Sequence, residues 1–126
     1  MPITLQVDHE RREVETVATG PITYAEIEQH LLEERNFGGL PYREFVDARD
    51  ASLVFAGYSA QIRQIVALIR NLGQQSTLGP SAVLVSDDFS FGVTTFLKML
   101  VEDVAEIMPF RDESEARAWL ASKSVQ

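Results

Sequence analysis

Cysteine is absent from this chain of 126 residues. Its absence excludes disulfide bonds, thiol nucleophiles and thiolate metal sites. Long apolar runs are missing too, because a stretch such as Ile65-Val66-Ala67-Leu68-Ile69 is far shorter than the roughly 20 residues of a membrane-spanning helix. The first residues have no basic segment followed by an apolar one. We therefore expect no signal peptide, no membrane span and a cytoplasmic protein.

Positive charge is scarce, with 11 Lys and Arg against 19 Asp and Glu and a net charge of −8. Nucleic-acid binding needs clustered Lys and Arg, so we expect no nucleic-acid partner. Docking on an anionic membrane is disfavoured for the same reason. The apolar share of 45% and the charged share of 24% are ordinary for a soluble globular protein. The length suits one domain, residues 1–126, with a continuous core.

The apolar pattern predicts five strands, at residues 3–7, 13–19, 43–48, 81–86 and 107–110. Ile3, Leu5 and Val7 alternate with polar residues, as in a half-buried strand. The apolar run 82–85 is typical of a strand that is covered on both faces. We expect Gly20-Pro21 to end the second strand, and residues 49–57 to form an unusually apolar loop.

Four helices are predicted between and after these strands. Thr23 and Glu26 form a capping box for the first helix, and Asp112 and Glu115 do so for the last. Residues 58–72 form the second helix, with Gly73 at its end. Asp87 or Asp88 caps the third helix, whose expected core stripe contains the following residues: Phe89, Val93, Phe96, Leu97, Leu100 and Val104.

The order of elements is ββαβαβαβα, which predicts an α/β fold. Helical connections between successive strands imply parallel pairing and right-handed crossovers. We therefore expect a single five-stranded, mostly parallel sheet whose first two strands form an antiparallel hairpin. Pro109 cannot donate to a ladder and places the last strand at an edge. Trp119 is expected to be largely buried, and Gly92 to let the third helix approach the sheet.

Three segments resemble the STAS-like, or SpoIIAA-like, superfamily. They are residues 45–49 (Phe-Val-Asp-Ala-Arg), residues 90–93 (Ser-Phe-Gly-Val) and residues 110–120, which end in Ala-Trp-Leu. The superfamily includes anti-sigma-factor antagonists and, more distantly, the CRAL-TRIO lipid carriers. The chain is similar over nearly its whole length to small stand-alone bacterial domains of unassigned function. The resemblance implies a STAS-like fold and an interaction or regulatory role.

The chain departs from the phosphorylated antagonists of that superfamily. They carry an Asp-Ser-Ser-Gly type of turn where the third strand leads into the second helix. Here the stretch is Phe55-Ala56-Gly57-Tyr58, with no hydroxyl at the phosphoacceptor position. Ser59 follows slightly later and is explained more simply as a helix cap. The departure argues against a phosphorylation switch.

Acidic residues gather where predicted strands end, and the carboxyl ends of strands are common ligand sites in open α/β sheets. They are Asp47 and Asp50 after the third strand, with Arg49 between them, and Asp87 and Asp88 after the fourth. Hard cations favour carboxylates. Helix capping and pairing with Arg49 account for the same residues, so we expect no metal and no cofactor.

The two histidines, His9 and His30, lie far apart in this topology, and neither has a second ligand at metal spacing. We expect both on the surface. No Ser-His-acid set can be assembled from local sequence, so no catalytic residue is assigned.

Aromatic residues near the carboxyl ends of the third and fourth strands are the strongest candidates for binding. Phe55 and Tyr58, beside Ser59, follow one strand, while Phe89 and Phe91 follow its neighbour. Residues two apart on a helix cannot share a face. We expect Phe89 in the core and Phe91 in an exposed apolar patch, since such patches often mark a binding surface.

Three functions remain open. The first is a non-enzymatic interaction domain that binds a protein partner or a second copy of itself. The second is a carrier of a small apolar molecule or lipid, by analogy with CRAL-TRIO proteins. It needs a pocket for which a closely packed domain of this size has little room. The third, a small hydrolase or metal enzyme, has the least support.

Overall fold

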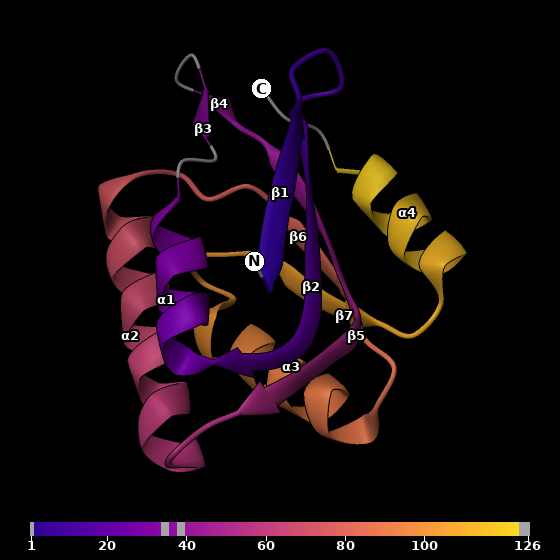
Figure 1. The fold of residues 1–126 in the computed structure, drawn as a ribbon. Coiled ribbons are helices and arrows are strands. Elements are labelled where there is room, and N and C mark those ends of the chain that lie inside the picture. Colours follow the sequence, from indigo (N-terminus) through magenta and orange to yellow (C-terminus); the bar gives the residue numbers. More distant parts are fainter. Residues whose placement is uncertain (1, 34–35, 38–39, 124–126) are drawn as a thin grey trace.

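The computed structural model describes residues 2–33, 36–37 and 40–123. The polypeptide forms seven strands and four helices within that part of the chain (Figure 1). The strands are β1 (Ile3–Asp8), β2 (Glu13–Thr23), β3 (Asn36–Phe37), β4 (Leu40–Pro41), β5 (Arg43–Val54), β6 (Ser81–Leu84) and β7 (Ile107–Phe110). The helices are α1 (Tyr24–Leu32), α2 (Tyr58–Gln75), α3 (Asp88–Val101) and α4 (Glu113–Ala121).

A five-stranded sheet in the order β1-β2-β5-β6-β7 forms the centre of the fold. The β1–β2 pair is antiparallel and the other three pairs are parallel, which confirms the predicted α/β sheet. Pro109 lies opposite Val83 on the edge strand β7, as expected. The short antiparallel pair β3–β4 was not predicted. The glycines between its strands, residues 38 and 39, lie outside the described residues.

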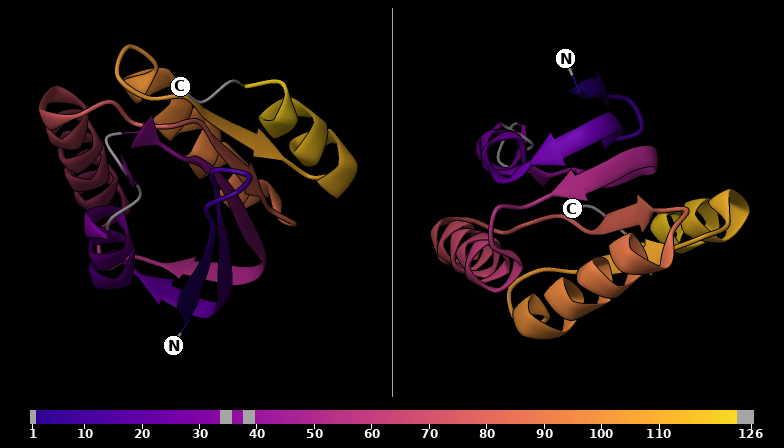
Figure 2. Two further views of the ribbon diagram at one scale, coloured as in Figure 1. Left: turned by 90° about the horizontal axis from the view of Figure 1, so that it is seen from above. Right: turned by 60° about the horizontal axis from the view of Figure 1, so that its bottom comes forward.

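Helices cover both faces of the sheet, and each face has its own apolar cluster. Helices α1 and α2 lie on one side and α4 on the other, as Figure 2 shows in its left view. On the α4 side the core consists of Phe45, Ala82, Leu84, Ala116 and Leu120. On the other side, the fully buried side chains are Phe55, Ile65, Ile69 and Val101, with partly buried residues of α1, α2 and α3 packed around them.

Strands β2 and β5 are longer than predicted. Their parallel ladder continues from Thr19 opposite Asp50 to Thr23 opposite Val54, so residues 49–54 form a strand and not a loop. Gly20-Pro21 does not stop β2, because Gly20 adopts a φ of 71° that lets the paired strand continue after a register shift. The alternation of Ala51 and Leu53 with Asp50 and Ser52 is the signal that sequence interpretation missed.

The helices differ from the prediction at three further positions. Helix α2 continues through Gly73 to Gln75, where a Cβ on residue 73 would lie 2.9 Å from Cβ of Val104. Gly73 therefore allows close helix packing and does not end the helix. Gly57, not Ser59, is the N-cap of α2. Gly92 is exposed with open space around it, so it does not serve an approach of α3 to the sheet.

The buried face of α3 is also different from the predicted stripe. Its buried residues are Ser90, Val93, Thr94 and Val101, whereas Phe89, Phe96 and Leu100 are exposed. The Thr94 hydroxyl donates to the carbonyl of Ser90, which is four residues earlier, so it can be buried without a lost hydrogen bond. Of the predicted stripe, Val93 is buried and Leu97 and Val104 pack against the core, whereas the prediction was wrong for the three exposed residues.

Trp119 is partly buried and not largely buried as predicted. Its ring lies against Phe110, with Lys123 above it at 4.9 Å from the ring centroid. Ala116 and Leu120 are the residues of α4 that are fully buried against the sheet. These two side chains anchor the helix, and Trp119 packs against the cluster that they form with the sheet.

Two glycine substitutions should have opposite effects on stability. An alanine at Gly79 would place its Cβ against the backbone carbonyl of Tyr42, so the unfolding free energy should fall by about 1–3 kcal/mol. An alanine at Gly92, exposed inside α3, should raise it by about 0.5–1 kcal/mol. Urea denaturation of both variants measures the difference. A stable Gly79→Ala variant would contradict the close approach of these two segments.

Candidate functional site

A cavity of about 200 Å³ lies between the sheet and the three helices α1, α2 and α3. Most side chains around it are apolar. The sheet contributes Ile3, Thr16, Ala18, Ile22, Glu44, Val46, Ala48, Ala51, Leu53, Ser81, Val83 and Ile107. The helices and the loop before α2 contribute Ile27, His30, Leu31, Phe55, Ile65, Ile69, Val93, Thr94 and Leu97.

Small side chains on the sheet leave this space unfilled. Ala18, Ala48 and Ala51 occupy positions of β2 and β5 that face the helices. Val46 and Val83 stand in the middle of the sheet, yet both keep surface that a water molecule could touch. On the opposite face of β5 and β6, Phe45 is 1% exposed and Leu84 is 0% exposed. The hollow therefore belongs to one face of the sheet.

A polar cluster forms one end of the cavity. Glu44 is buried, at 5% exposure, and it accepts a hydrogen bond of 2.6 Å from the hydroxyl of Thr16. Nε2 of His30 lies 2.8 Å from the same carboxylate oxygen, Oε2. The hydroxyl of Ser81 donates to the other oxygen, Oε1, at 3.3 Å. The cluster thus joins β2, β5, β6 and α1 around the carboxylate of Glu44.

Strand register explains why these residues meet. Glu44 is aligned with Val14 on one neighbouring strand and with Ser81 on the other. Thr16 lies two residues beyond Val14 and therefore on the same face of β2. His30 reaches the cluster from α1. Sequence analysis did not select Glu44, although a charged residue in phase with Val46 and Ala48 was the available signal.

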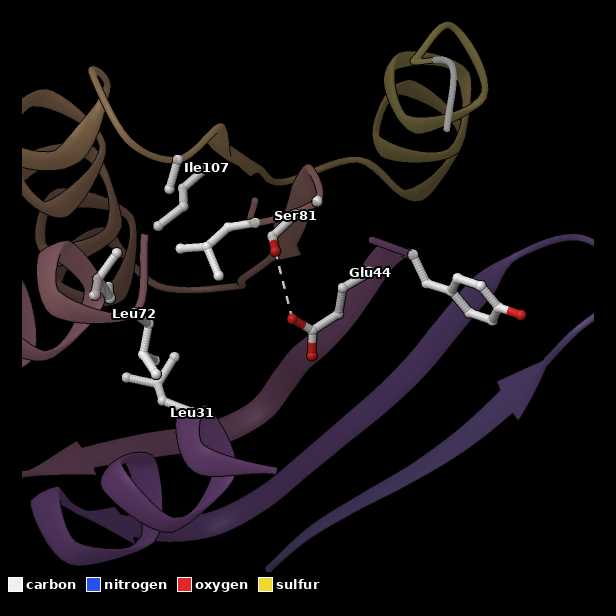
Figure 3. A pocket seen from close by; sticks show the side chains of 10 residues that line it. Leu31, Glu44, Leu72, Ser81 and Ile107 are labelled. Carbon is white, nitrogen blue, oxygen red and sulfur yellow. Dashed lines mark hydrogen bonds between the residues drawn. The ribbon is translucent and has the colours of Figure 1, made fainter. Parts of the chain in front are cut away.

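A smaller hollow of about 70 Å³ adjoins the polar cluster (Figure 3). It shares Leu31, Glu44, Ile69, Ser81 and Ile107 with the larger cavity. Figure 3 shows Glu44 and Ser81 facing each other, with Leu31, Leu72 and Ile107 on the apolar side of this hollow. The carboxylate thus lies where the two spaces meet.

The expectation that both histidines lie on the surface was wrong for His30. Its side chain is 11% exposed and contacts Glu44, while Nδ1 lies 3.6 Å from a carboxylate oxygen of Glu33. His9 is exposed, and its Nδ1 lies 3.0 Å from the hydroxyl of Tyr42. Only His30 contributes to the candidate site.

Three of the four aromatic candidates lie side by side, and Phe91 is the exception. Tyr58 contacts Phe55 with ring centroids 5.8 Å apart and Phe89 with centroids 5.1 Å apart. Phe55 is buried, whereas Tyr58 and Phe89 are about half exposed. Phe91 is partly buried beneath the guanidinium of Arg111. Phe89, and not Phe91, is therefore the more exposed of the two phenylalanines on α3.

The polar candidates at the strand ends have structural partners. Two hydrogen bonds from the Arg49 side chain hold the pKa of Asp47 below its ordinary value. Asp87 caps α3. Its carboxylate accepts a hydrogen bond from the backbone N–H of Ser90, and this hydrogen bond lowers the pKa of Asp87. Asp88 pairs with Arg111 at 2.6 Å. Ser59 is exposed in the first turn of α2.

The described residues include no group of three or more His, Asp or Glu side chains arranged to hold a metal ion. None of the helices in this part of the chain combines the length and apolar character that crossing a membrane requires.

This arrangement of strands and helices is similar to that of a solved structure. An uncharacterised protein of the DUF3478 family from Shewanella loihica PV-4, described as having a SpoIIAA-like fold, superposes with a TM-score of 0.61. The match covers 94% of this chain and 93% of that chain, at 18% sequence identity. The fold is SpoIIAA-like.

At this identity the likeness establishes the fold alone, and it agrees with the expected STAS-like architecture. No family model matches the sequence. No curated protein matches it either. A function for this SpoIIAA-like fold therefore rests on the side chains of the chain itself.

Proposed function

We propose that this SpoIIAA-like domain is a non-enzymatic binding domain that holds a small apolar molecule between its sheet and helices α1, α2 and α3. The observation that carries the proposal is the cavity of about 200 Å³. An engineered cavity of about 150 Å³ lined by Leu, Ile and Phe takes up benzene. A ligand somewhat larger than one aromatic ring would fit here.

The nature of the lining supports a binding role. Side chains such as Ile65, Val83 and Leu97 offer apolar surface, and a few polar groups are gathered at one end, as in typical small-molecule sites. In a Ser-His-acid arrangement the imidazole lies between the hydroxyl and the acid. Here Glu44 occupies the middle position, between Ser81 and His30. The cluster is thus suited to orienting a bound molecule.

Filling the cavity should abolish binding without harming the fold. We expect toluene to shift the NMR methyl signals of Val46, Val83 and Leu97 in the native protein. In Ala48→Leu the added side chain occupies the void, so these shifts should disappear while the midpoint of urea denaturation is kept or raised. NMR titration and denaturation of the same samples measure both effects.

Ala67→Leu is the matched control, because Ala67 is exposed on the outer side of α2. It should bind toluene as the native protein does. A closed, conventionally packed core would give the opposite pattern. Toluene would then have no effect, and Ala48→Leu would lose about 1–3 kcal/mol of stability through overpacking.

A second candidate function, homodimer formation through α3, has its own supporting observation. Phe89, Phe96 and Leu100 recur at the spacing of one helix face and are 47%, 48% and 40% exposed. Tyr58 extends this α3 patch at the Phe89 end. A two-fold axis would bury the patch of one copy against that of another.

The dipole of α3 fits such a pairing. Two copies of the helix packed antiparallel across this face would have opposed helix dipoles, which is the favourable arrangement. The occupant that we infer for the α3 patch is therefore a second copy of this chain.

Sedimentation equilibrium tests the dimer. Native protein should sediment as a dimer at concentrations where Phe96→Glu is monomeric, since a buried glutamate would be unpaired in the interface. Leu32→Glu is the control because Leu32 is exposed on α1, away from the patch, and it should leave the dimer intact. A monomeric native protein, or a dimer that survives Phe96→Glu, would overturn the pairing.

A further inference from the structure

The two edges of the five-stranded sheet differ in how well they are protected from further pairing. Strand β1 forms one edge and β7 the other. On β7, Pro109 cannot donate a hydrogen bond, and the strand has only four residues. From Ile3 to Val7, β1 contains no proline, no charged residue and no register shift in its ladder with β2. Such features keep edge strands from pairing, so the β1 edge is open to a further strand.

The hydrogen-bond pattern of β1 shows which backbone groups face outward. The N–H of Thr19 donates to the carbonyl of Pro2 at 2.8 Å, so these two residues form a hydrogen-bonded pair of the antiparallel ladder. Such pairs alternate with pairs that exchange no hydrogen bonds. In the register of the hairpin, the N–H and C=O groups of Ile3, Leu5 and Val7 therefore point away from β2. No strand in the described part of the chain pairs with them.

These three residues can pair with the same residues of a second copy. In an antiparallel register centred on Leu5, the two copies of Leu5 lie opposite each other, and Ile3 lies opposite Val7 of the second copy. Each of the three residues then donates one backbone hydrogen bond and accepts one. Their partly exposed side chains share one face of β1, so the pairing also brings apolar surfaces together.

The other face of β1 fits the same register. Thr4 would lie opposite Gln6 of the second copy, so no like charges would meet between these residues. A register centred on Ile3 or on Val7 would place Leu5 opposite a residue outside β1. Leu5 is therefore the centre that keeps all three outward-facing residues paired within the strand.

We propose that two copies of this chain pair through their β1 strands, antiparallel across a two-fold axis, and form one continuous sheet. The inference goes beyond the proposed function and does not depend on it. Ile3 also lines the cavity, so Val7 of the second copy would lie next to a residue of the candidate site. Helix α3 packs beside β7 at the opposite edge of the sheet, so the β1 edge and the α3 patch are separate surfaces (Figure 2).

Analytical ultracentrifugation of Phe96→Glu isolates the strand pairing, because this substitution places a charge in the α3 patch and leaves β1 unchanged. Two edge strands bury only a narrow strip of surface, so their dimer should form at higher protein concentrations than a dimer through α3. Phe96→Glu should therefore be monomeric in dilute solution and dimeric when concentrated. A Phe96→Glu protein that stays monomeric up to its solubility limit would overturn the proposal.

Two double substitutions in the Phe96→Glu background test the register. Thr4 and Gln6 are exposed, so changes at both positions should leave the monomer folded, which circular dichroism checks. Thr4→Glu with Gln6→Lys places opposite charges across the two-fold axis, whereas Thr4→Lys with Gln6→Lys places like charges there. The dissociation constant of the dimer should be about tenfold lower for the first pair of substitutions than for the second. Equal dissociation constants would show that this edge is not the interface.

Amide hydrogen exchange measured by NMR locates the contact. In dilute Phe96→Glu, the amides of Thr4 and Gln6 are bonded to β2 and should exchange slowly. Those of Leu5 and Val7 should exchange quickly in the dilute sample and become protected in the concentrated one. A dimer without that protection uses another surface, and the proposal then fails. Toluene binding to the cavity is measured separately, so this failure would leave the proposed function standing.

Discussion

The parallel ladder between β2 and β5 is the constraint on which the remaining structure depends. It runs from Glu13 opposite Arg43 to Thr23 opposite Val54, and it places a row of small side chains on the face that meets α1, α2 and α3. On the other face Phe45, Ala82 and Leu84 pack against Ala116 and Leu120 of α4. The two faces of β5 and β6 are therefore packed differently.

The hollow face connects the fold to a function. Close packing is the normal state of a protein interior, whereas this hollow of about 200 Å³ is partly open to solvent and leaves apolar side chains in contact with water next to a buried carboxylate. A bound molecule would recover the lost contacts. The Glu44 carboxylate is held by Thr16, His30 and Ser81, so in the proposed binding domain it is a fixed polar group at one end of the cavity.

The sequence predicted the fold well because its signals are local. The capping box of Thr23 and Glu26 and the cap of Asp87 mark helix starts, and both are present. The site was missed because its parts are distant in sequence and meet only through strand register. Glu44 and Ser81 are neighbours on adjacent strands, and His30 joins them from a helix. No local sequence pattern indicates how much space the neighbouring side chains leave unfilled between the sheet and the helices.

Xenon binding tests the central claim most directly, because xenon enters apolar cavities and needs no polar contact. Crystals of the protein would be pressurised with xenon and the bound atoms located by diffraction. Xenon is expected between Val46, Val83 and Leu97, on the helix side of the sheet. Crystals that bind no xenon there, with side chains filling the space, would contradict it.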